Sequence, residues 1–428
     1  MTTGSDSPHD GAPNSSNPDS IIRRGTARAA LQYRDFRVMW MSNIGSSIGA
    51  WMQNVVLPAY VYARTGRASI VGIFIFAQLG PLLFLSLPGG VIADKVDRRT
   101  WLVAMQSVQL VFSVFLGISA AMDASIALLF FMQLGVGIGN ALSAPAYSAV
   151  LPSLVPPEDL PGTISLSSAA INGSRVAGPI IAAILSSWGV TPAQVFFINA
   201  ATYLAVIGAL FRVNIPKATP SKEKGWQSFT LGIRTVRERP VLSRILISMF
   251  TFSLISLPYV GLFPAVADKN FGIDGSSAMY KWLYAVWGLG AMFGALAVGT
   301  VLAQHDKRRL ARQGFLVFAL LLTAFAISRT PLLAFISGFF LGMAYFATTT
   351  ALMTVLQSRL ELEVRARVLA LWFMAFGGTV PLGNMLFGPV MDSIGSRPVL
   401  FLGAAWSLLL AWWCNTEKID NTLERSNT

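Results

Sequence analysis

The segment GVIADKVDRR at residues 90–99 is a short charged interval between two long apolar blocks, and it indicates how the whole chain is organised. A second segment, GTVLAQHDKR at residues 299–308, stands in the same position between two later blocks. Gly90 corresponds to Gly299 and Asp97 to Asp306, and both pairs are 209 residues apart. A repeated loop of this kind favours a chain built from two related halves, as in many transporters.

The sequence around these segments is too apolar for a soluble protein. Hydrophobic residues make up 54% of the chain and charged residues 12%, whereas about a quarter of a soluble domain is charged. The apolar residues fall in blocks of about 20, the length at which a helix crosses about 30 Å of hydrocarbon. Twelve blocks can be drawn, at residues 36–62, 70–92, 101–122, 125–150, 161–188, 193–211, 243–266, 280–301, 310–327, 332–357, 365–391 and 398–413. The sequence therefore predicts an all-α membrane protein with twelve transmembrane helices in two six-helix bundles related by pseudo-two-fold symmetry.

These blocks divide the chain into five predicted parts. They are a disordered cytoplasmic tail and basic segment, an N-terminal bundle, a cytoplasmic linker, a C-terminal bundle and a cytoplasmic tail, at residues 1–35, 36–211, 212–242, 243–413 and 414–428. The first 20 residues lack the apolar core of a signal peptide, and a single cysteine, Cys414, excludes an intrachain disulfide.

The linker itself predicts an amphipathic helix. Its apolar residues recur at spacings of three and four, opposite two arginines, and Pro240 follows them. Such a helix lies at the membrane surface with its apolar face in the lipid. The apolar positions are Trp226, Phe229, Ile233 and Val236, and the arginines are Arg234 and Arg237.

The net charge of +12 is explained by topology. With the N-terminus placed in the cytoplasm, the cytoplasmic segments hold 25 of the 32 Lys and Arg residues. One further cation, Arg175, lies inside a span, and the outer loops hold Arg64, Arg67, Lys269, Lys281, Arg329 and Arg397. This asymmetry follows the positive-inside rule, so we expect both termini in the cytoplasm and no nucleic-acid partner.

The segment at residues 90–99 resembles the loop signature of the major facilitator superfamily. The resemblance rests on Gly90, Asp94 and the cations Arg98 and Arg99, although the family often has Gly where this chain has Asp97. It implies a gating motif in which Asp94 meets the N-terminus or a cation of a neighbouring helix. The expected neighbour is the start of the eleventh span, at Arg365 or Arg367.

The fifth span is similar to a glycine–proline motif of exporters in this superfamily, carried here by Asn172, Gly178 and Pro179. Longer stretches resemble its transmembrane secretion effector branch, which includes enterobactin and macrolide exporters. They are GAWMQ at residues 49–53, PSLVPPEDL at 152–160 and RARV at 365–368. The resemblance covers residues 36–413 and implies export of small molecules, while substrate identity is open.

Arg175 is the one cation expected within the membrane. Burying a cation there costs about 3 kcal/mol or more, so Arg175 should face protein or a water-filled cavity. Two interpretations stay open at this point. Arg175 either anchors an anionic substrate or locks a conformation, or it is a structural tie to backbone carbonyls or Asn172.

The resemblance to the major facilitator superfamily implies a central cavity lined mainly by the first, fourth, seventh and tenth spans. The predicted substrate cavity therefore comprises Arg175 and the polar or aromatic residues near the middle of those spans and the eighth, namely Gln53, Asn54, Gln133, Asn140, Tyr259, Trp287, Tyr345, Thr348 and Thr349. Amides, hydroxyls and rings with little charge suit amphipathic cargo, but each residue can equally be a tie between helices. Gly135, Gly137 and Gly139 are expected to be close-packing positions.

Mid-membrane carboxylates are absent from the predicted spans. All 20 acidic residues fall in loops, tails or span ends, and both histidines, His9 and His305, fall in cytoplasmic segments. Proton-coupled transporters usually carry a buried acid, so coupling through Asp94 or Asp35 is implied by the resemblance alone.

Other function classes fit poorly. A membrane enzyme needs a cluster of acids, metal ligands or an activated nucleophile, and an ATP-driven pump needs a phosphate loop; the sequence has neither. We predict a monomeric secondary transporter of the bacterial inner membrane, without cofactor or metal, that exports siderophore-like metabolites or drugs by alternating access. The alternatives are a facilitator, importer or flippase of a lipid-like substrate, and a membrane scaffold or receptor without transport.

Overall fold

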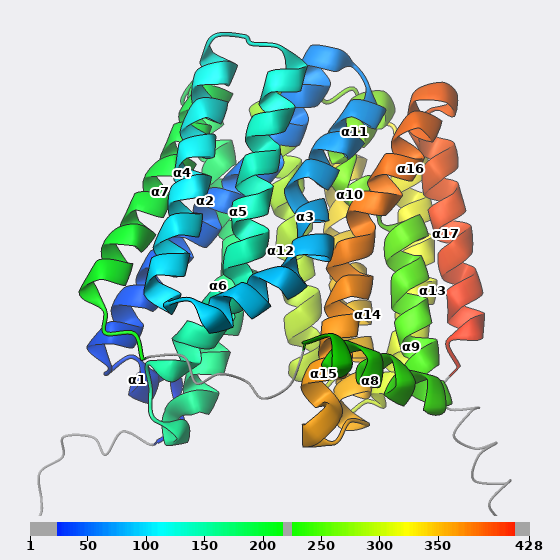
Figure 1. The fold of residues 1–428 in the computed structure, drawn as a ribbon. Helices are drawn as coiled ribbons and strands as arrows, with labels where there is room; N and C mark the ends of the chain where they lie inside the picture. Colours follow the sequence, from blue (N-terminus) through cyan, green and yellow to red (C-terminus); the bar gives the residue numbers. More distant parts are fainter. Residues whose placement is uncertain (1–23, 217–224, 416–428) are drawn as a thin grey trace, which may run out of the picture.

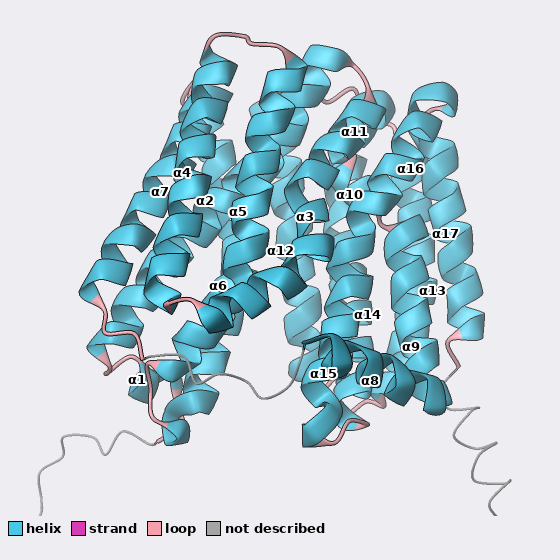
Figure 2. Cartoon of the chain, viewed as in Figure 1, coloured by secondary structure: helices cyan, strands magenta, loops and turns pink. Residues whose placement is uncertain are grey.

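The computed structural model describes residues 24–216 and 225–415, which form two neighbouring groups of helices (Figure 1). Helices joined by short loops make up this part of the chain, as Figure 2 shows. The predicted disorder of residues 1–20 concerns residues outside the described part.

The first bundle contains six long helices. After the short α1 (Ala27–Ala30) come α2 (Arg34–Thr65), α3 (Ala68–Lys95), α4 (Arg98–Ala121), α5 (Ile126–Ser153), α6 (Leu160–Ser187) and α7 (Pro192–Arg212), with the 3₁₀ turn η1 (Pro157–Asp159) before α6. Their ends follow ordinary capping chemistry. Gly66 ends α2 in the left-handed conformation, and Thr191 and Gln194 form a capping box at the start of α7.

The linker helix α8 (Gly225–Glu238) precedes the second bundle and confirms a helix in this segment. It packs on α9 and α15, and the chain bends by 114° between α8 and the helix after Pro240. The second bundle comprises α9 (Pro240–Thr251), η2 (Phe252–Ser256), α10 (Pro258–Gly261), α11 (Phe263–Phe271), α12 (Ala278–Gly299), α13 (Lys307–Ile327), α14 (Pro331–Ser358), α15 (Leu362–Phe373), η3 (Met374–Gly378), α16 (Thr379–Ile394) and α17 (Ser396–Trp413).

Nine helices of the described part are long and apolar enough to cross a membrane, or ten if the bent pair counts as one span. The twelve-block prediction adds α2 and α17, which have the length of a span (32 and 18 residues) but lie outside that set. In α2, polar residues such as Asn43, Ser46 and Gln53 lower the mean hydropathy. These residues line a cavity that is described below.

Helix packing confirms the predicted duplication. In the first bundle α3 packs on α5, α4 on α5, and α4 on α7; in the second, the equivalent pairs are α12 with α14, α13 with α14, and α13 with α17. The two repeated segments share a capping aspartate, although residues 90–95 continue α3 whereas residues 300–305 form turns after α12. Asp97 accepts a hydrogen bond from the Thr100 amide (2.9 Å) and caps α4, while Asp306 accepts one from the Arg308 amide (2.8 Å) and caps α13.

The three glycines predicted as close-packing positions are confirmed. A Cβ atom at Gly137 would overlap the backbone carbonyl of Ala77 on α3, and one at Gly139 would lie 2.7 Å from Gln109 on α4. At Gly135 it would overlap the ring of Phe112. The central helix α5 can approach its neighbours this closely only because these side chains are absent.

The two bundles meet mainly through α3 with α16 and through α6 with α12. The polar contacts of these pairs lie at the end of the bundles opposite α1 and α8, here called the far end (Figure 1). The Asp392 carboxylate, on α16, accepts hydrogen bonds from the Ala68 and Ser69 amides at the start of α3 (2.7 and 2.9 Å). On the other pair, Lys281 donates to the Ser186 hydroxyl (2.8 Å).

A further far-end contact joins α2 to α11, where the Tyr62 hydroxyl donates to Asp268 (3.0 Å). Lys269 lies 3.8 Å from Asp392 and donates to the Met391 carbonyl (3.0 Å). The bundles are therefore held together at the far end.

Candidate substrate-binding cavity

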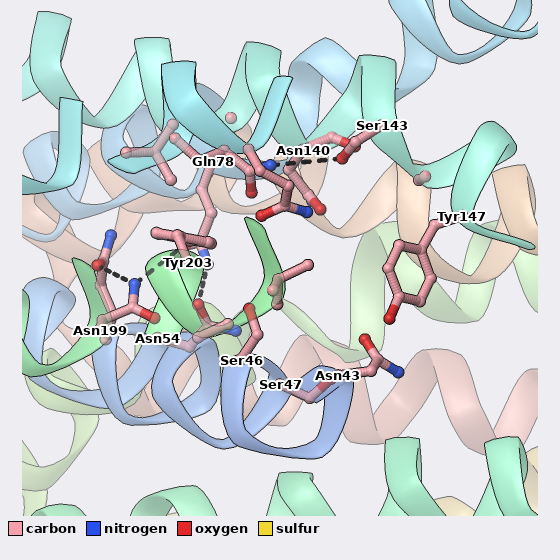
Figure 3. A pocket seen from close by; sticks show the side chains of 18 of the residues that line it. Asn43, Ser46, Ser47, Asn54, Gln78, Asn140, Ser143, Tyr147, Asn199 and Tyr203 are labelled. Carbon is pink, nitrogen blue, oxygen red and sulfur yellow. Dashed lines mark hydrogen bonds between the residues drawn. The ribbon is translucent and has the colours of Figure 1, made fainter. Parts of the chain in front are cut away.

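A polar cavity of about 370 Å³ lies within the first bundle and is called the amide cavity here. Its wall is formed by side chains from α2 to α7, and Figure 3 shows them converging on the space between the helices. Three residues that line it, Asn140, Ser148 and Ile171, are exposed, so the cavity is accessible from outside the protein. The polar lining comprises Asn43, Ser46, Ser47, Gln53, Asn54, Gln78, Gln106, Gln109, Gln133, Asn140, Ser143, Tyr147, Ser148, Asn199 and Tyr203.

Hydrogen bonds between amides fix the inner wall of this cavity. The Gln53 amide donates to Gln133 (2.8 Å) and its oxygen accepts from Asn199 (2.7 Å). Gln78 donates to Asn54 in the same region. The Gln106 side-chain oxygen, in contrast, is buried without a partner among the described residues. A buried acceptor left in this way is available to a donor on a ligand.

A second cavity of about 240 Å³ lies between the bundles and is called the aromatic cavity here. Its wall combines Trp51 and Arg175 of the first bundle with rings of the second, namely Tyr280, Tyr284, Trp287, Tyr345, Phe346 and Phe376. Asn54, Gln78 and Leu79 line both cavities, which therefore adjoin.

Arg175 lies between two aromatic rings, one from each bundle. The central carbon of its guanidinium is 5.1 Å from the ring centre of Trp51 and 4.6 Å from that of Phe346. Its Nε atom is buried, and no described residue accepts a hydrogen bond from its side chain. The Asn172 amide donates instead to the Ser168 carbonyl (2.9 Å). The expected tie to Asn172 or to backbone carbonyls is therefore not formed in this structure.

The predicted cavity residues are distributed over three environments. Gln53, Asn54, Gln133 and Asn140 line the amide cavity, and Asn54, Arg175, Trp287 and Tyr345 line the aromatic cavity. Tyr259, Thr348 and Thr349 are buried and line neither of them.

Each of these last three side chains has a partner inside the second bundle. The Tyr259 hydroxyl accepts from the Trp287 indole (3.2 Å), Thr348 donates to the Ala344 carbonyl (2.7 Å) and Thr349 to the Phe346 carbonyl (3.2 Å).

Several lining residues are absent from the sequence prediction. On α2 these include Asn43, Ser46 and Ser47, whose spacing places them on the same helix face as Gln53 and Asn54. That spacing was a usable signal for the amide cavity. Tyr280, Tyr284 and Phe346 carried no comparable signal, because aromatic residues occur in every apolar block.

The predicted gating motif is described only in part. Gly90 and Asp94 lie in α3, but the Asp94 side chain is outside the described part of the chain. Arg99 donates to the Val213 carbonyl (2.6 Å) and Arg365 to the Leu360 carbonyl (3.3 Å). Arg98 is half-buried at the start of α4, and the Arg367 carbonyl faces Gly232 of α8.

The exporter-type motif lies where α6 crosses α2. A Cβ atom at Gly178 would overlap the Trp51 Cβ atom, so Gly178 permits the close approach of the two helices. Pro179 is buried inside α6. The motif thus places Arg175 beside Trp51 at the wall of the aromatic cavity.

Comparisons with known proteins agree with this architecture. The chain is similar to macrolide efflux protein A of Streptococcus pyogenes, with 24% identity over 416 residues that cover 89% of this chain and 95% of that protein. It is also 24% identical over 338 residues to the enterobactin exporter of Escherichia coli, covering 79% of this chain and 80% of the exporter.

Solved transporter structures share the fold. A bacterial homologue of the human lysosomal transporter Spinster, in an inward-facing and unoccupied conformation, has a TM-score of 0.70 at 15% identity and covers 90% of this chain and 96% of its own. The nucleoside transporter NupG has a TM-score of 0.68 at 13% identity, covering 89% and 98%.

The family model described as transmembrane secretion effector matches residues 25–423, nearly the whole chain. Together with the helical bundles, this makes the protein an integral membrane transporter and not an enzyme. The chain belongs to the transmembrane secretion effector family within the major facilitator fold.

Proposed function

We propose that the protein exports small amphipathic molecules by alternating access, with cargo held in the joined amide and aromatic cavities. The observation that carries the proposal is the position of the aromatic cavity between two bundles that are held together by hydrogen bonds at the far end. Rocking of the bundles about this region would expose the same cavity to the other side of the membrane.

The distribution of cations supports an orientation with both termini in the cytoplasm of a bacterial cell. In that orientation the far end is the outer face. A conformation that is closed at the far end and open at the opposite end would then be inward-facing, and cargo would enter it from the cytoplasm.

Two relatives favour export over uptake, since a macrolide efflux protein and an enterobactin exporter are similar along most of this chain. Siderophore-like metabolites and drugs are therefore the first cargoes to test. The energy source is a separate question, because no acidic residue of the described part lines either cavity. That observation favours the alternative of a facilitator or flippase that moves a lipid-like molecule down its gradient.

The test is flux into sealed inside-out vesicles, with a panel of drugs and siderophores and with or without an imposed proton gradient. Gradient-driven accumulation, absent from vesicles lacking the protein, would support coupled export. Movement that equilibrates without regard to the gradient would support the facilitator. No movement of any compound by folded protein would contradict both.

A further inference from the structure

We propose that the joined cavities select an amphipathic organic anion: an anionic aromatic part at Arg175 and an uncharged polar part in the amide cavity. This inference rests on the proposed function, because it names the class of cargo that the same cavities would carry.

The charge balance around Arg175 is the first argument. Arg175 is a cation within a membrane-spanning helix, and no acidic residue of the described part lines the aromatic or the amide cavity. An unpaired cation in a medium of low dielectric constant is strongly disfavoured. A ligand that brings its own negative charge would offset this cost, whereas a cationic ligand would add repulsion.

The geometry of the guanidinium is the second argument. Trp51 and Phe346 lie near it at cation–π distances, and its Nε–H has no acceptor among the residues that the structure describes. Stacking on rings uses the faces of the planar guanidinium and leaves its in-plane N–H groups free. Those donors match the two oxygens of a carboxylate, sulfonate or phosphate.

The aromatic cavity also suits a flat ring next to the anionic group. Tyr284, Trp287 and Tyr345 belong to one cluster, with the Trp287 and Tyr345 rings nearly parallel at 25° and 6.0 Å apart. Rings arranged in this way offer large apolar contact areas and specific stacking geometry. A ligand ring would contact these walls while its acidic substituent meets Arg175.

The amide cavity supplies the complementary half of the site. It adjoins the aromatic cavity at Asn54, Gln78 and Leu79, which line both, and in this proposal one ligand extends past these side chains from one cavity into the other. Amides both donate and accept hydrogen bonds, and the buried Gln106 oxygen has no partner among the described residues. Hydroxyl or amide groups of a neutral tail would satisfy such groups without needing a charge.

The test measures binding to purified protein in lipid nanodiscs by equilibrium dialysis. Three probes share a naphthalene ring and a diol-bearing amide tail and differ only in one ring substituent: a carboxylate, its methyl ester or a primary ammonium. We expect the carboxylate to bind about tenfold more tightly than the ester, and the ammonium to bind most weakly. Equal affinities, or tightest binding of the ammonium, would overturn the proposal.

Variants assign the selectivity to named residues. Arg175→Gln should remove the preference for the carboxylate while leaving ester binding within about threefold, and Arg175→Lys should keep part of the preference. Arg67→Gln removes an exposed cation outside both cavities and should change nothing. An unchanged preference in folded Arg175→Gln would contradict the role of Arg175; if that variant fails to fold, the wild-type probe series decides alone.

The neutral part of the site and the proposed function are tested separately. Gln106→Leu should weaken the binding of probes that carry the diol tail and leave the binding of tail-less analogues unchanged. Equal weakening of both would show that Gln106 does not contact the tail. The same probes are then measured in vesicle flux. Transport without anion preference would overturn this inference and leave export standing, whereas anion-selective binding without transport would overturn export and leave the binding site.

Discussion

Among single residues, Gly178 sets a steric limit on the wall of the aromatic cavity. A Cβ atom there would overlap Trp51 and lie 3.0 Å from backbone atoms of Ile48 and Met52. Trp51 in turn lies against the guanidinium of Arg175. The approach of α6 to α2 therefore determines where the one cation of the cavity is held.

Gly178→Ala should destabilise the protein, because the added methyl group meets backbone that cannot move aside. Overpacking of this kind costs about 1–3 kcal/mol, and we expect a lower midpoint in thermal unfolding and weaker binding in the aromatic cavity. Gly173→Ala is the matched control, since it lies on the same helix with no atom within 4 Å. Both changes raise helix propensity equally, so similar behaviour of the two variants would refute the steric argument.

At the same scale, the sequence predicted the amide half of the site better than the aromatic half. Gln53 and Gln133 are costly to bury singly in a membrane and therefore stood out as polar residues within apolar blocks. Tyr259 and Tyr345 are chemically alike, yet only Tyr345 lines the aromatic cavity. Which face of a bundle helix meets the cavity depends on the packing of its neighbours, and a nearly uniform apolar pattern does not encode it.

At the scale of elements, the caps of the repeated loops are equivalent and can be compared directly. Asp97 caps α4 and Asp306 caps α13. Hydrogen bonding to the Thr100 amide lowers the pKa of the Asp97 carboxyl, and the Arg308 side chain lowers the pKa of the Asp306 carboxyl. Asp97, which stands where relatives in the superfamily often have Gly, is thus a helix cap.

Replacing either aspartate by Ala should cost about 1 kcal/mol of stability, whereas Asn should preserve most of the cap. Because a lowered pKa stabilises the charged form in the folded protein, each contribution is present above about pH 4 and is lost as the pH falls through the lowered pKa. Unfolding midpoints of Asp306→Ala and wild type should therefore converge in acid. A constant difference between them at every pH would argue against capping by the charged carboxylate.

The sequence also predicted most element boundaries, but it missed interruptions in two spans of the second bundle. The seventh span contains the π-helical turn η2 before Pro258, and the eleventh contains η3 at residues 374–378. Pro258 was a visible signal, since proline lacks the amide hydrogen needed inside a helix. No proline lies within η3; a π-helical turn there changes only the hydrogen-bond register and leaves the apolar pattern intact.

At the scale of the whole molecule, α3 packs on α16 of the eleventh span, and a carboxylate holds the far end of this contact. At the far end Asp392 accepts hydrogen bonds from two backbone amides at the start of α3. At the other end Asp94, near the end of α3, is expected to meet the start of α15, as the resemblance implies. The proposed alternating access requires the same chain to form both arrangements in turn, and in that case its sequence alone does not select the conformation described here.

Asp392→Ala should open the far end. The substitution removes the charge-assisted hydrogen bonds from the start of α3 and the attraction between Asp392 and Lys269. These interactions are together worth about 1–2 kcal/mol, which corresponds to a five- to thirtyfold shift from the conformation closed at the far end to the one open there. We would introduce a single cysteine at Gly275, where an added Cβ atom lies 3.6 Å from Ala59 across the bundle interface, in a chain with Cys414 replaced. In the proposed orientation we expect faster alkylation from outside the cell. An unchanged rate would show that Asp392 does not hold the far end closed.

Asp94→Asn should have the opposite effect on the same reporter. Asp94 is expected to stabilise an arrangement that is closed at the end opposite the far end. Its loss should then favour the state described here, and the cysteine at position 275 should react more slowly than in the parent protein. Binding of the carboxylate probe should change less than the rate of transport, because position 94 is at the end of α3, whereas Gln78 and Leu79 in the middle of that helix line the cavities. Combining Asp94→Asn with Asp392→Ala should restore an intermediate alkylation rate, as expected when two contacts bias one equilibrium in opposite directions. If Asp94→Asn instead accelerated alkylation, or reduced binding and transport equally, Asp94 would not be the counterpart of Asp392 at the opposite end of the bundles.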